Sequence, residues 1–284
     1  MTVFSFRERP WEPPFFDAIA ELSRQRATRF FEARSRQAAS HADFWKTSSV
    51  DLILAVSWRY LIPPEIYRLA RLGAFVFHDS LLPAYRGFSP TVWAMINGQS
   101  QTGVTLFEIA EEVDAGDIVD QLPVPIGAQE TIADVLDRVT RAYLTLLDRN
   151  LTALLAGTAP RRVQDHSLAT YTCSRDPADN LIDWRWPSTR ILNLIRAVTV
   201  PYTGAFTHHA GQKLIVWAAA PLPSFPRRYV GSIPGKIVEV RRAEGSVVLT
   251  GDGALLLTRV QKEDGDPVCA SVLLNSLACK LGSW

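Results

Sequence analysis

One histidine stands where a strand-like apolar run gives way to a polar loop. Phe75 to His78 reads FVFH, and the chain continues as DSLLPAYRG up to Gly87. A histidine in this position is either a packed core residue or a catalyst, because imidazole can give or take a proton near neutral pH. The polar loop directly after it favours a catalytic role in proton transfer for His78.

Two further groups of side chains could act with this histidine. In the segment VDAGD, Asp114 could orient His78, favour its protonated form or relay a proton through water. Asp114 and Asp117 could equally be turn residues, since Asp-Ala-Gly-Asp suits a turn. In the loop after His78, Arg86 could bind a phosphate or carboxylate, or it could be a solvated loop residue. His41 and His166 lie in polar loops, and we assign them no role.

The elements that must position these residues alternate along the first half of the chain. Strands are predicted at 2–6, 28–33, 50–56, 73–78, 103–109 and 117–126. Helices are predicted at 14–25, 63–73 and 89–98. The run at 50–56 is nearly all apolar, which is typical of a strand covered on both faces. The alternation predicts an α/β fold with a Rossmann-like, mostly parallel sheet and helices on both of its faces.

Ligands of open parallel sheets bind beyond the carboxyl ends of the strands. The segments after the strands at 50–56 and 73–78 fall there, as does the one before 117–126. We therefore expect His78, Asp114 and Arg86 to converge on one crevice. No GxGxxG motif follows the first strand and no GxxxxGK[ST] motif occurs, which disfavours dinucleotide and P-loop sites.

The second half of the chain begins with the longest helix, predicted over 131–157. Thr131 and Asp134 fit a capping box at its start, and Gly157 fits its end. Short strands and turns dominate from about residue 204, which predicts a small β-barrel-like (OB-like) domain. We expect a catalytic domain at 1–190, a connecting helix and linker at 191–204, and a β-rich domain at 205–284.

Composition limits the class of protein. Apolar residues make up 47% and charged residues 21%, as in a globular chain, and the formal net charge is +1. That charge disfavours nucleic-acid and membrane partners. Three widely spaced cysteines without a CxxC motif argue for a reducing compartment and against a metal site. No signal peptide or membrane span is evident, so we expect a cytoplasmic protein.

The segment HDSLLPAYRGFSPTVWAMINGQSQTGVTLFEIAEEVDAGDIV resembles the signature region of the formyltransferases that use 10-formyltetrahydrofolate. His, S-L-L-P, Arg-Gly, I-N-G, T-G-V-T and D-A-G-D occur in the order and spacing of that family. PGKIVEV and GDGALLLTRVQ look like parts of its C-terminal domain. The resemblance covers nearly the whole chain and is weakest at residues 1–50.

The resemblance implies a role for each matching residue. His78 and Asp114 match the catalytic histidine and aspartate. The formyl donor would lie along the backbone of one loop and near a second, at Trp58, Arg59, Tyr60, Leu61, Ile62, Val113 and Asp114. The acceptor side would be formed by Ser80, Leu81, Leu82, Pro83, Tyr85, Arg86 and Gly87.

One signature residue is missing. The family places an Asn two residues before the catalytic His, and its side chain donates to the formyl oxygen; here Val76 stands in that position. Losing such a donor typically lowers the rate by roughly a hundred- to a thousand-fold. A protonated His78 could stabilise the oxyanion alone, Ser80 or a backbone N–H could replace the Asn, or the chain could perform a different acyl transfer or none.

The resemblance also bears on the acceptor. SWRYLIP and TCSRDPADNLIDWRW look like segments of the nucleotide-sugar N-formyltransferases. We therefore expect formyl transfer from 10-formyltetrahydrofolate to the amine of a small acceptor, a nucleotide-linked amino sugar. The alternatives are another small amine from an amino acid, peptide or siderophore precursor, methionyl-tRNA, or a binding homologue without this activity. By the same resemblance, a homodimer is one expectation.

Overall fold

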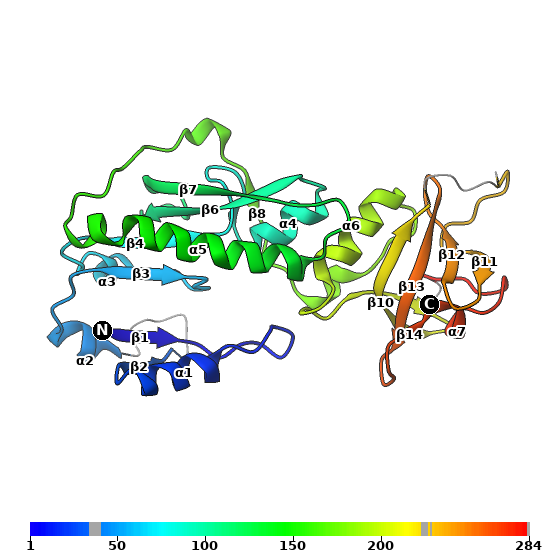
Figure 1. The fold of residues 1–284 in the computed structure, drawn as a ribbon, viewed down its shortest axis with the longest axis horizontal. Coiled ribbons are helices and arrows are strands. Elements are labelled where there is room, and N and C mark those ends of the chain that lie inside the picture. The colour runs from blue at the N-terminus through cyan, green and yellow to red at the C-terminus, as the bar shows by residue number, and fades with distance from the viewer. Residues whose placement is uncertain (34–40, 223–226, 228, 283–284) are drawn as a thin grey trace. The chain divides into compact units, whose positions relative to one another are not determined.

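The computed structural model describes residues 1–33, 41–222, 227 and 229–282. The chain forms two compact units (Figure 1). The first contains residues 1–90, 102–124 and 137–173, and the second contains residues 91–101, 125–136 and 174–284.

The first unit is built on a four-stranded sheet of order β3-β4-β6-β7. Its strands are β3 (Ile53–Val56), β4 (Ala74–His78), β6 (Gln101–Glu108) and β7 (Ile118–Pro125). β3 and β4 run parallel, whereas β4 and β6 run antiparallel, with His78 opposite Thr105. The sheet is therefore mixed, and the α/β class predicted from the sequence is confirmed.

A second, smaller sheet precedes it in the chain. β1 (Thr2–Ser5) pairs in parallel with β2 (Arg29–Glu32). The helices α1 (Phe16–Gln25), α2 (Ala42–Thr47), α3 (Pro64–Tyr67) and α4 (Pro90–Ile96) complete this part of the sequence. The helix predicted over 63–73 is only one turn long, because the chain turns at Tyr67 and Ala70 bridges to Val50.

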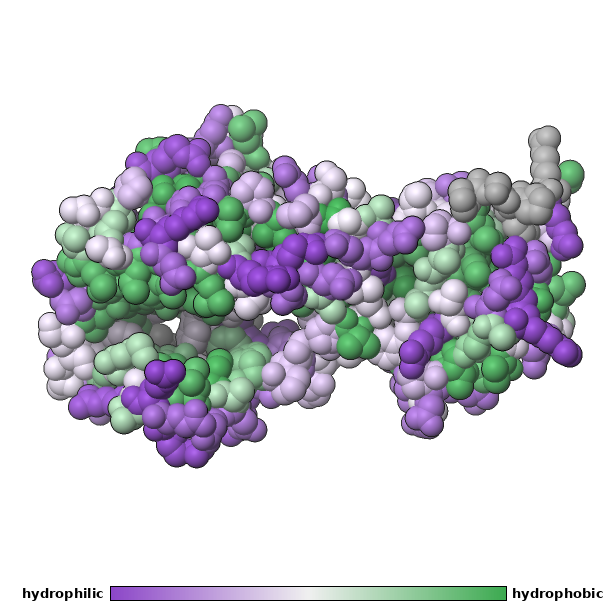
Figure 2. Space-filling view, in the orientation of Figure 1, coloured by the Kyte–Doolittle hydropathy of each residue, from purple (hydrophilic) through white to green (hydrophobic). Residues whose placement is uncertain are grey.

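The strand β3 is not covered on both faces, and that prediction is wrong. The side chains of Leu54 and Val56 are 36% and 53% exposed. Among the described strands β3 pairs with β4 alone, so it is an edge strand. Figure 2 shows apolar surface around a hollow between the places of β3 and β1 in Figure 1. A continuous apolar run therefore marked an edge here, rather than the middle of the sheet.

The helix α5 (Ile132–Leu155) covers one face of the four-stranded sheet. The ring centroid of Tyr143 lies 5.7 Å from that of Phe77 in β4. The side-chain Nδ2 of Asn150 donates to Asp120 Oδ2 of β7 at 3.0 Å. Leu146 is fully buried. These contacts bind the helix to the two strands that flank β6.

Both ends of α5 follow the sequence signals. The carboxylate of Asp134 accepts hydrogen bonds from the N–H and the hydroxyl of Thr131, each at 2.8 Å. Gly157, after the last turn, has a φ of +68°, a conformation that glycine adopts without steric cost. The start and stop predicted at these residues are confirmed.

A two-residue pairing joins distant parts of the first unit. β5 (Arg86–Gly87) runs parallel to β8 (Tyr171–Thr172), with two short 3₁₀ helices nearby in sequence at His166–Leu168 (η2) and Pro177–Asn180 (η3). The N–H groups of Arg86 and Phe88 donate to the carbonyls of Thr170 and Thr172 at 2.8 and 3.2 Å. The segment around β8 thereby holds the loop that follows His78.

The second unit contains an antiparallel sheet of order β11-β12-β13-β10-β9, with β14 on β13. Its strands are β9 (Ala205–His209), β10 (Gln212–Pro221), β11 (Ile237–Arg241), β12 (Gly245–Leu249), β13 (Ala254–Lys262) and β14 (Val268–Cys269). The helices α6 (Ser188–Val198) and α7 (Ala270–Leu273) pack against it. The buried stripe of α6 is Ile191, Leu194, Ile195 and Val198, as its spacing predicts.

The packing of α5 gives a matched test of the core. We expect Leu146→Ala to lower the free energy of unfolding by about 2–5 kcal/mol, because it leaves a cavity under the helix. Leu144 is 59% exposed on the same helix, so Leu144→Ala should change it by about 0.5 kcal/mol or less. Urea unfolding of the two variants measures the difference, and equal losses would contradict this packing.

Candidate active site

The imidazole of His78 is held at the end of β4. The residue is 7% exposed, and its Nε2 lies 2.8 Å from the backbone carbonyl oxygen of Tyr85. A carbonyl oxygen can only accept, so Nε2 carries a proton and donates it to Tyr85. Nδ1 is therefore the nitrogen that remains for chemistry, and it faces Asp114.

Asp114 lies in the turn before β7, with its Oδ2 3.7 Å from Nδ1 of His78. The same oxygen accepts a hydrogen bond of 2.7 Å from the N–H of Gly87. Asp114 has a φ of +54°, which is unusual for a residue with a side chain. The structure thus brings together His78 and Asp114, the two residues matched to catalytic roles.

Gly87 can make this contact because it has no side chain. Its φ is +103°, and a Cβ built there would lie 2.5 Å from the carbonyl oxygen of Thr172. Only glycine tolerates both the conformation and the close approach of β8. A glycine is therefore required after Arg86, because a larger residue could not place its N–H against Asp114 so close to β8.

The rest of the loop after His78 is fixed by internal hydrogen bonds. Ser80 is 2% exposed, and its hydroxyl donates to Ala84 O at 2.7 Å. Thr105 Oγ1 donates to Ser80 O at 2.7 Å and accepts from the N–H of Leu82 at 3.1 Å. Leu81, Pro83 and Tyr85 are half-buried. Of the residues predicted on the acceptor side, Ser80 and Leu82 are buried and used within the loop itself.

Arg86 is also buried, and more completely. Its guanidinium is 0% exposed, and NH2 donates to Gln164 Oε1 at 2.8 Å. The same nitrogen lies 3.1 Å from His166 Nδ1. A side chain enclosed in this way does not present its charge to a phosphate in solution.

Val76 lies two residues before His78 on the same face of β4. It packs against a small apolar cluster of Leu82, Phe107 and Ile118. Val76 therefore offers no hydrogen-bond donor at the position where the family pattern has an Asn. The neighbours of its side chain in this cluster are also apolar.

The loop after β3 turns its side chains onto the N-terminal segment. Trp58 and Tyr60 contact the ring of Phe6, at centroid distances of 5.2 and 5.5 Å. The guanidinium of Arg59 lies 4.2 Å from that ring and pairs with Glu12. Only the side chain of Leu61, 74% exposed, extends into solvent, and Ile62 is half-buried.

The backbone of the same loop is left for another partner. Within the described part of the chain, no N–H or C=O group of Trp58 to Ile62 forms a hydrogen bond with another residue. Unpaired backbone groups of this kind bind water or a ligand. A heterocycle with alternating donors and acceptors along one edge would suit them.

A half-buried tyrosine of α5 contacts the loop that follows His78. The hydroxyl of Tyr143 donates to Asp79 Oδ1 at 3.3 Å. Burial, followed by the neighbouring carboxylate of Asp79, raises the pKa of Tyr143 well above its ordinary value of 10.0. The sequence carries no signal for this contact, because Asp79 and Tyr143 are brought together only by the folded chain.

Gln164 is the second residue near the site that the sequence did not reveal. It is 3% exposed, and its Nε2 donates to the carbonyls of Asp114 and Gly116 at 2.9 and 2.7 Å. The residue stands in an irregular polar segment, where no periodicity distinguishes a buried amide from a solvated one.

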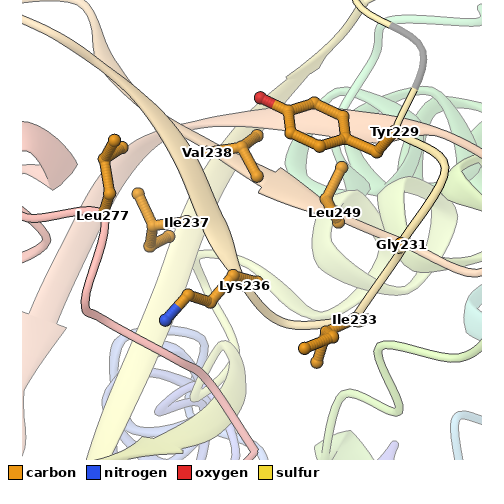
Figure 3. Close-up of a pocket in the computed structure, with 8 residues that line it drawn as sticks. All are labelled: Tyr229, Gly231, Ile233, Lys236, Ile237, Val238, Leu249 and Leu277. Carbon is orange, nitrogen blue, oxygen red and sulfur yellow. The ribbon is translucent and has the colours of Figure 1, made fainter.

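A cavity of about 320 Å³ lies in the second unit (Figure 3). Its wall is mostly apolar: Val238 and Leu249 lie beside the ring of Tyr229, and Ile237 lies nearer to Leu277. The amine of Lys236 points away from that ring and donates to Ala278 O at 3.0 Å. None of the predicted site residues lines this cavity, so it carries no part of the predicted chemistry.

The described residues also lack two kinds of feature. Among them, no three His, Cys, Asp or Glu side chains are arranged to hold a metal ion. No helix in the described part of the chain is both long enough and apolar enough to cross a lipid bilayer.

Comparison with protein families gives two matches. The model of the formyl transferases matches residues 7–150, and the model of the formyl transferase C-terminal domain matches residues 175–278. Together the matches include His78, Asp114 and the β-rich second unit.

Solved structures with a similar fold belong to proteins with several different activities. HypX from Aquifex aeolicus in complex with tetrahydrofolic acid is 20% identical, with a TM-score of 0.65, over 96% of this chain and 47% of its own. WlaRD, a sugar 3N-formyl transferase solved with dTDP and 5-N-formyl-THF, is 17% identical, with a TM-score of 0.62, over 87% and 82%. Methionyl-tRNA formyltransferase from Clostridium thermocellum is 20% identical, with a TM-score of 0.57, over 78% and 94%.

These similarities establish the fold alone. This chain spans about half the length of the HypX structures that it matches. Because the sugar and tRNA enzymes both appear among the similar structures, the comparison does not select an acceptor.

The raised pKa of Tyr143 predicts a loss of stability in alkali. Below about pH 10 the phenol is protonated in both the folded and unfolded chain, and above it only the unfolded chain ionises. The free energy of unfolding should then fall by up to about 1.4 kcal/mol per pH unit from this group. This contribution is absent from Tyr143→Phe. The free energy of unfolding of the wild type minus that of Tyr143→Phe should therefore decrease between about pH 9 and about pH 11. Urea unfolding across this range measures it, and a constant difference would contradict the assignment.

Proposed function

This chain belongs to the formyl transferase family, and on that basis we propose that it transfers a formyl group from 10-formyltetrahydrofolate to a primary amine. The observation that carries the proposal is the pairing of His78 with Asp114, whose Nδ1 and Oδ2 lie 3.7 Å apart. Apo distances of this kind commonly shorten when substrate binds.

The loop from Trp58 to Ile62 suits the pterin of the donor. Its side chains are engaged by Phe6 and Glu12, while its backbone groups are free of other described residues. Backbone donors and acceptors can pair with the edge of a pterin. When bound, the donor would supply an electrophilic formyl carbon beside the His78 and Asp114 side chains.

His78 and Asp114 have separate tasks in this proposal. Tyr85 O accepts the Nε2 proton of His78, and in the imidazolium form the second proton is on Nδ1, the nitrogen that faces Asp114. Nδ1–H then donates to the formyl oxygen as it gains negative charge. Asp114 accepts the proton that the attacking amine loses, and this proton is returned to the leaving nitrogen of the donor.

Val76 makes His78 the main donor to the formyl oxygen. The hydroxyl proton of Ser80 is committed to Ala84 O, and the N–H of Gly87 is committed to Asp114. Neither is therefore well placed to replace the missing Asn. We expect turnover about a hundred- to a thousand-fold below that of an otherwise equal site with the Asn donor.

For the acceptor, we propose a nucleotide-linked amino sugar. The support comes from the SWRYLIP and TCSRDPADNLIDWRW segments and from the formal net charge of +1, which gives little attraction for a tRNA. A sugar 3N-formyl transferase is among the structures with a similar fold.

A second acceptor class is favoured by one observation. The guanidinium of Arg86 is fully buried, so this loop lacks the free cation that would recognise a diphosphate. A small amine without a nucleotide would not need it. Formyl transfer to a panel of dTDP- and UDP-linked amino sugars and of free amino acids separates the two classes, and saturable binding of dTDP or UDP alone would favour the first.

Substitution of the paired residues tests the mechanism. We expect His78→Gln and Asp114→Asn each to lower kcat by about 10²- to 10⁴-fold, since each removes one partner in proton transfer. The affinity for 5-formyltetrahydrofolate, measured by calorimetry, should change by about 3-fold or less because neither side chain holds the pterin in this proposal. Wild-type protein that fails to bind this stable analogue would sink the donor assignment.

Val76→Asn tests the missing donor directly. The variant restores a hydrogen-bond donor near the formyl oxygen, so kcat should rise by about 10-fold or more. The amide would face Leu82 and Phe107, so the free energy of unfolding should fall by about 1–3 kcal/mol. Val76→Ala is the control, because it changes the packing without adding a donor and should not raise kcat. An Asn variant that is no faster than the Ala variant would show that the position no longer faces the reaction.

A further inference from the structure

Arg86, which is itself buried, stands at the centre of a polar network next to the site. Besides Gln164 and His166, its guanidinium approaches Tyr171 and Glu112, with NH1 3.3 Å from the hydroxyl and 3.5 Å from Oε1. Removing a guanidinium from water is costly unless acceptors meet its N–H groups. Here both terminal nitrogens have acceptors, whereas Nε is buried without one among the described residues. The acceptors come from three separate segments, so the charge ties those segments together.

Gln164 is the member of this network that reaches the site. Its Oε1 accepts from Arg86, which fixes which end of the amide faces the guanidinium. Its Nε2 must then face the opposite way, where it donates to the carbonyls of Asp114 and Gly116. Arg86 thus determines the orientation of an amide that holds the turn around Asp114.

That turn needs to be held. Asp114 has a φ of +54°, a conformation that is unfavourable for a residue with a Cβ. Gly116 lies so close to β6 that a Cβ there would overlap the carbonyl oxygen of Glu108. The two hydrogen bonds from Gln164 stabilise this strained turn at the point where the carboxylate of Asp114 leaves the backbone.

The segment Arg86–Gly87 therefore fixes Asp114 through two separate contacts, one direct and one through Gln164. The N–H of Gly87 binds the carboxylate directly at 2.7 Å, and the side chain of Arg86 acts on the carbonyl through Gln164. The first contact fixes the oxygen that faces His78, and the second fixes the backbone that carries it.

We propose that Arg86 and Gln164 are positioning residues that hold Asp114 against His78. This inference rests on the proposed function, since it concerns the same pair of side chains. Neither residue touches the reacting atoms. Both act on the distance and direction of the Asp114 carboxylate, and a displacement of about 1 Å at such a group can cost on the order of a hundred-fold in rate.

The decisive variant is Gln164→Glu in the full chain. The glutamate keeps an oxygen for Arg86 but replaces the donor to Asp114 and Gly116 by an acceptor that repels their carbonyls. We expect kcat for formyl transfer to fall by about 10- to 100-fold, with the affinity for 5-formyltetrahydrofolate within about 3-fold of the wild type. The imidazole ¹⁵N signals of His78, assigned with His78→Gln, should move to the positions that they take in Asp114→Asn.

Asn150→Asp is the matched control. Asn150 is another buried amide of the first unit, 7% exposed, and its Nδ2 donates to Asp120 and to Leu146 O rather than to the site. The same amide-to-acid change there should lower stability and leave the His78 signals at their wild-type positions. If Gln164→Glu proves insoluble, Gln164→Asn replaces it, because the shorter amide cannot span from Arg86 to the turn.

The two readouts separate this inference from the proposed function. If the wild type transfers no formyl group to any amine, the proposed function fails, and the His78 signals still report on the position of Asp114. Wild-type His78 signals in a folded Gln164 variant would overturn the positioning role. Loss of analogue binding together with kcat would also overturn it, because that would indicate general damage rather than displacement of Asp114.

Discussion

The hydrogen bond from the N–H of Gly87 to Asp114 Oδ2 joins the two segments that make the candidate site. On one side is the loop after β4, where Tyr85 O fixes the ring of His78; on the other is the turn before β7. The bond requires a residue without a Cβ, because Thr172 of β8 leaves no room for one. The pairing of β5 with β8 brings Gly87 to this position, so a two-residue ladder determines how the imidazole and the carboxylate face each other.

The sequence predicted those parts of this arrangement that have a period or a recognisable end. The long helix predicted over 131–157, its Thr131–Asp134 start and the strand that ends at His78 are confirmed. The β5–β8 pairing had no comparable signal, because two residues are too few for an alternating pattern. The same holds for Gln164, whose partners are brought to it only by the folded chain.

Two features differ from the usual rule that apolar side chains are buried and charged side chains are exposed. The apolar run of β3 leaves Val56 half exposed, because β3 is an edge strand, while the charged Arg86 is fully buried. Arg86 can be buried because Glu112, Gln164 and Tyr171 supply acceptors to the two terminal nitrogens of its guanidinium. Burial thus depends on which partners the fold supplies, and a segment read alone does not contain that information.

The contacts of the loop after β3 bear on how such a site could change over evolutionary time. Trp58, Arg59 and Tyr60 lean on Phe6 and Glu12, residues of the N-terminal segment. If the backbone of this loop binds a pterin, its course depends on contacts with the N-terminal segment. Substitutions at Phe6 and Glu12 could then change donor affinity without altering any residue of the binding loop or of the His78–Asp114 pair.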